Sequence, residues 1–148
     1  MNNKQEQLEA VRQNGFAIDY INNPDKEVQL AAVRDNGYAI RYIKNPDLEV
    51  QLEAVRENGY AIEYIKNPSR EVQLTAVKHE PYCLVYIIDP YEEVQLAAIR
   101  GNWRTIQFIK NSSIDMQMTA VKYNTYAINY INNPHKKVLL YCKIKNIL

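Results

Sequence analysis

The chain repeats one 22-residue pattern almost from end to end. Residues 24–45 read PDKEVQLAAVRDNGYAIRYIKN, and residues 46–67 read PDLEVQLEAVRENGYAIEYIKN. The frame continues without insertion, so that the units are 2–23, 24–45, 46–67, 68–89, 90–111, 112–133 and a truncated 134–148, here called repeats one to seven. A fixed period of this length is the signature of a solenoid, in which each unit buries its apolar face only against its neighbours.

Each repeat carries signals for two helices, one longer and one shorter. Asn-Pro at the start of a repeat, as in Asn45-Pro46, predicts an N-cap asparagine followed by proline at the first helical position. This helix is expected to run about eleven or twelve residues and to end at Asn-Gly, with Gly59 in a left-handed C-cap. A shorter helix of the YAIRYIKN type follows. The sequence therefore predicts an all-α solenoid, a single domain over 1–148 with about six and a half two-helix repeats.

Helical projection of the first helix places Val50, Leu52, Ala54 and Val55 on one buried arc. A glutamine stands at the centre of this arc in each full repeat: Gln7, Gln29, Gln51, Gln73, Gln95 and Gln117. A buried amide must be satisfied internally, so we expect these side chains to bond to backbone or to the next repeat, as a ladder, rather than to act in catalysis.

An aromatic residue recurs in the second helix: Tyr20, Tyr42, Tyr64, Tyr86, Phe108 and Tyr130. Such a row could form a stacking platform for nucleic-acid bases. Phe108 keeps the ring but lacks the hydroxyl, which favours a role in the core between repeats.

Composition excludes several classes of protein. The formal net charge is only +1, from 18 Lys and Arg against 17 Asp and Glu, so no global field attracts nucleic acid or an anionic membrane. Cys83 and Cys142 lie far apart and are interpreted as small buried residues in a reducing compartment. The N-terminal MNNKQEQ lacks the apolar segment of a signal peptide, and no apolar run approaches the ~20 residues that span a bilayer. We therefore expect a cytoplasmic protein without membrane contact.

The residue types that could carry catalysis do not form a recognisable set. His79 and His135 lie in different repeats, and the chain has no HExxH, no CxxC and no Gly-rich phosphate loop. Cys83 stands where several other repeats have alanine, and Pro81 separates it from His79. An acidic residue recurs in the first turn, where it is typical of solvated charge at a helix N-terminus: Glu27, Glu49, Glu71, Glu93 and Asp115. We therefore expect no enzymatic activity, no cofactor and no metal site.

One basic residue per repeat would form a stripe along the solenoid: Arg12, Arg34, Arg56, Lys78, Arg100 and Lys122. This basic row could follow a phosphate backbone, so nucleic-acid binding is the alternative function. Because the acidic residues run along the same helices and the total charge nearly cancels, a ladder of Glu–Arg pairs between repeats is the simpler interpretation.

Repeats four and five break the pattern. Val85 and Ile88 take outward positions of the second helix that are polar in the other full repeats, which predicts an exposed apolar patch. Tyr91 stands where repeats two to four have Asp or Ser, and Trp103 replaces a glycine, so that its turn is expected to be rebuilt. The predicted partner-binding residues are therefore His79, Val85, Ile88, Tyr91, Trp103 and Arg104. The alternative is drift within the array, with Trp103 filling the space left by Arg104 and Thr105.

The two ends also depart from the internal repeats. Glu6 replaces a first-helix valine, which suits a polar N-terminal cap. At the other end Leu139 replaces the glutamine, Ile144 replaces the basic residue, and the sequence finishes with Ile147-Leu148. A terminal repeat normally needs a polar outer face. This end is therefore predicted either to fold back over the stack or to form a homodimer through Ile144, Ile147 and Leu148.

The motif EVQLxAVRxNGYAIxYIKNP resembles the units, approximately EVVLAAVKxNGxAL, of an uncharacterised helical-repeat family of bacteria, phages and large viruses. The pattern of two helices per repeat also resembles the leucine-rich-variant and HEAT repeats. These resemblances imply a solenoid that recognises another macromolecule, with no catalytic residues to carry over. They imply by analogy a narrower function, a small phage or viral protein that blocks a host or defence protein by occlusion.

Overall fold

The computed structural model describes the backbone of residues 3–147 and the side chains of residues 3–145. In this part of the chain a longer α-helix and a short 3-10 helix alternate, and there is no strand. The α-helices are α1 (Lys4–Gln13), α2 (Lys26–Asp35), α3 (Leu48–Glu57), α4 (Arg70–His79), α5 (Glu92–Gly101), α6 (Ile114–Tyr123) and α7 (Lys136–Ile147). The 3-10 helices are η1 (Gly15–Tyr20), η2 (Gly37–Tyr42), η3 (Gly59–Tyr64), η4 (Pro81–Tyr86), η5 (Trp103–Phe108) and η6 (Thr125–Tyr130). The predicted all-α solenoid of paired long and short helices is confirmed.

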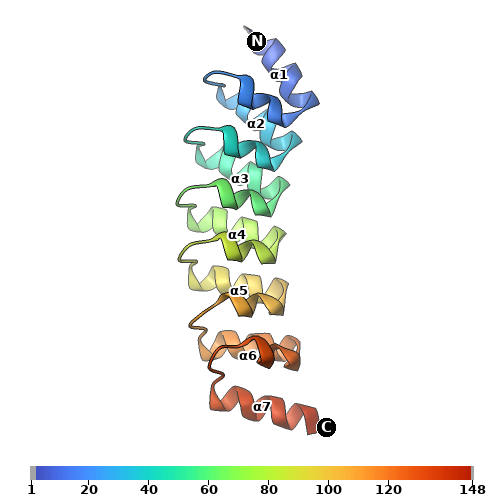
Figure 1. Cartoon of the computed structure of the whole chain (residues 1–148), viewed down its shortest axis with the longest axis vertical. Helices are drawn as coiled ribbons and strands as arrows, with labels where there is room; N and C mark the ends of the chain where they lie inside the picture. Colours follow the sequence, from blue (N-terminus) through green and yellow to red (C-terminus); the bar gives the residue numbers. More distant parts are fainter. Residues whose placement is uncertain (1–2, 148) are drawn as a thin grey trace.

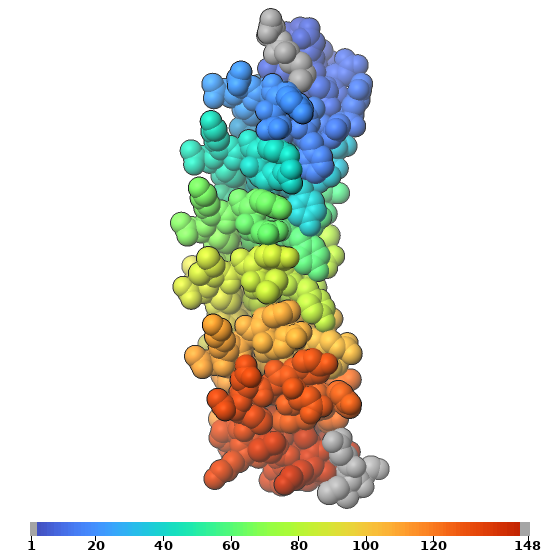
Figure 2. All heavy atoms as spheres, in the orientation of Figure 1, coloured from blue at the N-terminus to red at the C-terminus, as the bar shows by residue number. Residues whose placement is uncertain are grey.

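The repeats stack into an elongated rod with the two ends of the chain at opposite ends (Figure 1). Every contact between elements joins elements of one repeat or of neighbouring repeats. The space-filling view shows the same organisation, because the colours follow one another along the rod in sequence order (Figure 2). Stability must therefore come from each repeat covering the next, as in other solenoids.

The core lies between the layer of α-helices and the layer of 3-10 helices. In the second repeat, Val28, Ala32 and Val33 of α2 are buried, and Ile40 and Ile43 contribute from η2 and the residue after it. Both cysteines are free and buried in the same cluster. Their predicted role as small core residues is confirmed.

The α-helices begin differently from the prediction. Asn45 is not the N-cap: its φ is 51°, in the left-handed region, and Asp47 caps α3 by accepting a hydrogen bond from Val50 N at 3.0 Å. Pro46 therefore precedes the cap, and α3 has 10 residues. The equivalent left-handed residues are Asn23, Asn67, Asp89 and Asn133. Asn and Asp tolerate this conformation, and a following proline disfavours the right-handed α conformation, which accounts for the Asn-Pro pair.

The prediction of a left-handed glycine at the end of the α-helix is also wrong. No glycine has a positive φ in the described residues, and Asn58 is extended, with a φ of −149°. Asn58 N–H donates to Ala54 O at 2.9 Å, and its side chain accepts from Tyr60 N at 3.0 Å, so this residue ends α3 and begins η3. Glycine instead allows a close approach to the next repeat, since a Cβ on Gly59 would lie 2.7 Å from Ala76 O.

The turn before Trp103 is not rebuilt, contrary to the prediction. Asn102 keeps a φ of −152°, and its side chain accepts a hydrogen bond from Arg104 N at 3.0 Å. The turn survives because this position requires no left-handed conformation, so a residue with a Cβ can adopt its backbone.

Candidate partner-binding surfaces

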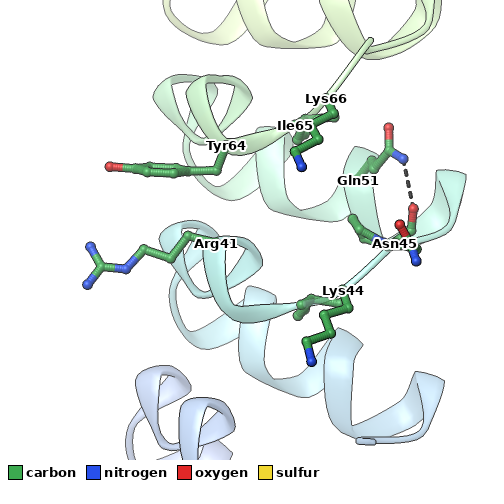
Figure 3. Close-up of a pocket in the computed structure, with 9 residues that line it drawn as sticks. Arg41, Lys44, Asn45, Gln51, Tyr64, Ile65 and Lys66 are labelled. Carbon is green, nitrogen blue, oxygen red and sulfur yellow. Dashed lines mark hydrogen bonds between the residues drawn. The ribbon is translucent and has the colours of Figure 1, made fainter.

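The recurring glutamines bond to the backbone of their own repeat. Gln51 Nε2 donates to Pro46 O at 2.8 Å (Figure 3). The same bond recurs from Gln29, Gln73, Gln95 and Gln117 to the residue five positions earlier. Gln117 Oε1 also accepts from His135 N in the next repeat at 2.9 Å. The predicted structural role is thus confirmed, whereas Gln73 Oε1 is buried and has no hydrogen-bond partner among the described residues.

The recurring aromatic residues form a ladder along the surface. Four pairs of rings from neighbouring repeats meet edge to face, with centroids 6.0–6.2 Å apart: Phe16–Tyr42, Tyr38–Tyr64, Tyr60–Tyr86 and Tyr82–Phe108. Tyr42, Phe108 and Tyr130 are half-buried against the core, as predicted, but Tyr20, Tyr64 and Tyr86 are exposed. The core prediction is wrong for these three, because isoleucines such as Ile40 and Ile62 fill the buried position.

Trp103 continues the aromatic ladder in the fifth repeat. Arg104 stands where the preceding repeats have the first aromatic ring of each pair, and its guanidinium lies 4.5 Å from the centroid of the Trp103 ring. Trp103 is half-buried and meets Tyr130 edge to face, with centroids 5.8 Å apart. Trp103 therefore supplies the aromatic ring that is missing at Arg104. This arrangement is expected if tryptophan at 103 compensates structurally for arginine at 104.

Ion pairs join neighbouring repeats, but most of those in the described residues do not involve the basic row. Lys4 Nζ lies 3.1 Å from Asp25 and 2.5 Å from Glu27 in the next repeat. Lys26 binds Asp47 and Glu49 in the same way, and Arg70 binds Glu93. Three of the recurring acidic residues, Glu27, Glu49 and Glu93, thus pair with the first residue of the preceding α-helix and not with the basic row.

These contacts change proton affinities. The hydrogen bond from the Val28 backbone N–H, followed by that from Lys4, lowers the pKa of Asp25, and Val50 and Lys26 do the same for Asp47. The neighbouring carboxylates, Glu27 first, raise the pKa of Lys4. Because the groups are exposed, solvent screens these pairs and limits their contribution to stability.

The six residues of the basic row are all exposed. Arg34 Nε lies 2.8 Å from Glu53 Oε1, and Arg56 Nη1 lies 3.6 Å from Glu53 Oε2. The other four, Arg12, Lys78, Arg100 and Lys122, have no carboxylate partner in the part of the chain that the structure describes. The row therefore presents at least four uncompensated cations.

Val85 and Ile88 form an exposed apolar patch at the end of η4, as predicted. Their exposed fractions are 52% and 88%. The same positions are Arg41 and Lys44 in the second repeat and Glu63 and Lys66 in the third. The patch is therefore apolar where the corresponding surface of the second and third repeats is charged.

Val85 also lines a groove of about 830 Å³ between the fourth and fifth repeats, together with Leu84, Pro90, Phe108 and Ile109. An equivalent groove of about 550 Å³ lies between the second and third repeats, where the charged residues are Arg41, Lys44 and Lys66 (Figure 3). The geometry of the groove thus recurs along the rod, and its lining differs between repeats.

The six predicted partner-binding residues fall into two clusters. Val85, Ile88 and Tyr91 lie where the chain passes from a 3-10 helix to the next α-helix, whereas His79, Trp103 and Arg104 lie where an α-helix turns into a 3-10 helix (Figure 1). These are opposite edges of the rod, separated by the length of a six-residue 3-10 helix, about 12 Å. The structure therefore does not bring the six residues into one surface.

Tyr91 lies at the N-cap position of α5 and makes no side-chain capping hydrogen bond. The equivalent Asp25, Asp47, Ser69 and Ser113 all accept a bond from the backbone three residues later. The exposed Tyr91 ring lies beside Arg70 and Glu93. The tyrosine therefore replaces a stabilising cap with an exposed aromatic ring.

The C-terminal end continues the stack and does not fold back in the described residues (Figure 1). Ile144 is exposed on α7, as are Leu139 and Leu140. The side chain of Ile147 and the whole of Leu148 lie outside the described part of the chain. The predicted self-association surface is thus described only for Ile144.

Burial raises the pKa of the Cys83 thiol to about 12, which keeps it protonated at neutral pH. Among the described residues, no group of three or more His, Cys, Asp and Glu side chains could hold a metal ion. No helix in this part of the chain is both long and apolar enough to cross a membrane.

A family model described as "Domain of unknown function (DUF4116)" matches residues 3–48 and again residues 25–68. The second match begins 22 residues after the first (25 − 3), which is one repeat. The chain is therefore similar to this family over its first three repeats. No curated protein and no solved structure matches the chain.

Proposed function

We propose that this protein is a non-enzymatic, protein-binding solenoid and that the groove beside Val85 and Ile88 is its principal contact surface. The observation that supports the proposal is the exposure of two neighbouring aliphatic side chains at positions that are charged in repeats two and three. Exposed apolar surface that interrupts a polar face is typical of a partner site.

The lining of the groove fits an apolar segment of a partner protein. Leu84, Val85 and Phe108 offer apolar contacts, and Asp89 and Lys110 add one charge of each sign. An apolar centre with a polar rim is the usual organisation of a protein–protein interface. A partner would therefore place one or two apolar side chains between η4 and η5.

Exchanging residues between repeats tests this proposal. The variant Val85→Arg plus Ile88→Lys introduces the residues of the second repeat, and the matched control, Arg41→Val plus Lys44→Ile, makes the reverse change there. Proteins captured from the native host with wild-type bait should be lost with the first variant and kept with the control. The binding of each purified partner should then weaken for the first variant alone. Retention of every partner by Val85→Arg plus Ile88→Lys would exclude this groove.

A narrower form of the proposal places the protein in the cytoplasm as a phage- or virus-type inhibitor that covers the active or interacting surface of a host protein. The resemblance of the repeats to those of phages and large viruses supports this form. The activity of a purified partner, measured with increasing amounts of the protein, tests it. Occlusion predicts loss of activity in proportion to binding, and full activity of a saturated complex would contradict it.

The alternative function is nucleic-acid binding along the basic row. It is supported by the exposed Arg12, Lys78, Arg100 and Lys122, which lack carboxylate partners among the described residues. Binding through phosphates predicts a mobility shift at low salt that disappears steeply as salt rises. No shift at low salt, or one unchanged by Lys78→Glu plus Arg100→Glu, would contradict this alternative.

A further inference from the structure

In the part of the chain that the structure describes, the C-terminal end of the rod leaves uncovered a surface of the kind that joins one repeat to the next. Leu8, in the first repeat, is only 5% exposed although no described element lies before α1, so the following repeat covers this position. Leu140 occupies the same position in the seventh repeat and is 59% exposed, because no described element follows α7. Tyr126 is exposed for the same reason. The equivalent Tyr38 meets the ring of Tyr64 in the following repeat, and no described residue takes the place of Tyr64 beside Tyr126.

Ile144 belongs to the same open surface. It occupies the position of Arg34, whose side chain reaches Glu53 in the following repeat. Ile144 is 51% exposed. Leu139, Leu140 and Ile144 together are here called the end face.

The end face lies on the most basic part of the chain. Residues 134–148 contain Lys136, Lys137, Lys143 and Lys145 and no acidic residue, which gives a charge of +4. The remaining residues, 1–133, carry 14 basic and 17 acidic side chains, which gives −3. Charge complementarity therefore favours an acidic occupant.

Lys136 indicates how that occupant would be oriented. It is the first residue of α7, at the position of Lys4 and Lys26. Each of those lysines binds the N-cap aspartate and a first-turn glutamate of the next α-helix, within 3.1 Å. Lys136 is exposed and has no carboxylate partner in the described part of the chain.

We propose that the end face binds a helix of another protein that begins with an Asp-x-Glu cap and packs as the α-helix of a further repeat would. Its carboxylates bind Lys136, and its apolar side covers Leu139, Leu140 and Ile144. This surface is independent of the groove beside Val85 and Ile88.

A second copy of the chain fits the end face less well. Two α7 helices packed together would bring lysines against lysines. In a head-to-tail arrangement, α1 would present Asn3 and Gln5 where α2 has Asp25 and Glu27, so Lys136 would remain unpaired. Glu6, at the position of the buried Val28, would also lose its exposure, and burial of a carboxylate is costly.

The chain itself provides a probe. A peptide of residues 46–67 begins with the Asp47 and Glu49 cap and has a net charge of −3, from five acidic and two basic residues. Fluorescence anisotropy of the labelled peptide, titrated with the full chain, should show saturable binding that weakens as salt rises. Lys136→Glu, and Asp47→Asn plus Glu49→Gln in the peptide, should each weaken it by about tenfold or more. The matched control Lys122→Glu should not change binding.

Three results would overturn the proposal. The first is no binding of the peptide at about 1 mM protein, and the second is binding that Lys136→Glu leaves unchanged. The third is sedimentation of the chain as a dimer that Ile144→Lys converts to a monomer, which would assign the end face to a second copy. Val85→Arg plus Ile88→Lys should leave peptide binding intact, so failure of this proposal and failure of the groove are distinguishable.

Discussion

The ring of Pro81 lies against the α-carbon of Gly101 in the following repeat, so closely that a Cβ on Gly101 would be 2.6 Å from Pro81 Cγ. In the first two repeats the equivalent residues are Gly15 and Asp35, and Gly15 N–H donates a hydrogen bond to Asp35 Oδ2 at 2.6 Å. Proline has no N–H to donate, and Gly101 has no side chain to accept. The two substitutions therefore form one compensated pair across a repeat boundary.

This contact predicts that the effect of Gly101→Ala on stability depends strongly on whether residue 81 is proline. Gly101→Ala should destabilise the protein by about 1–3 kcal/mol, because the methyl group meets a rigid ring, although alanine favours helix more than glycine does. Pro81→Gly plus Gly101→Ala should recover most of this loss. Urea unfolding followed by circular dichroism measures both variants. Equal stability of Gly101→Ala and wild type would show that the contact relaxes without cost.

The missing cap of α5 predicts a stabilising substitution. Tyr91→Asp should raise the free energy of unfolding by about 1 kcal/mol, because Asp at this position accepts a backbone bond in α2 and α3. Asp47→Ala is the matched control and should lower it by a similar amount. If Tyr91→Asp destabilises the protein, the tyrosine ring contributes more through its contacts beside Arg70 and Glu93 than a cap would.

The different contacts of the recurring glutamines predict that replacing glutamine by leucine lowers the free energy of unfolding by different amounts in different repeats. Gln117→Leu removes bonds to Ser112 and His135 and leaves His135 N–H without its partner, so it should cost about 1–3 kcal/mol. Gln73→Leu loses one bond to Pro68 and also removes a buried oxygen without a partner, so its cost should stay below about 1 kcal/mol. Equal losses in thermal or urea unfolding would contradict this difference.

The lowered pKa values of Asp25 and Asp47 predict loss of stability in acid. The unfolded chain takes up protons on these groups at the ordinary carboxyl pKa of about 3.9, and the folded chain does so only at lower pH. Their stabilising contribution is therefore complete above that pH and is lost as pH falls through the folded values. Melting temperatures measured between about pH 7 and pH 2 should fall less steeply for Asp25→Asn plus Asp47→Asn than for wild type. Parallel curves would contradict the assignment.

Several features of the site were predictable from the sequence because they depend on one repeat alone. The outward position of Val85 and Ile88, the backbone-bonded glutamines and the buried cysteines all follow from the position of a residue within its own helix. The N-cap was missed, although a signal was present: Asp25, Asp47, Ser69 and Ser113 recur at one position and are all good caps. The uneven distribution of charge, +4 in residues 134–148, was also visible in the sequence and would have indicated the basic end.

The 22-residue period and its apolar spacing determined the architecture, because equivalent residues of successive repeats have the same surroundings and must bury the same faces. Only the tertiary structure showed that Gly59 makes room for Ala76 O and that Lys4 pairs with Asp25 and Glu27. These relationships depend on how closely one repeat lies against the next. A repeated pattern shows which residues are equivalent but contains no information about the distances between them.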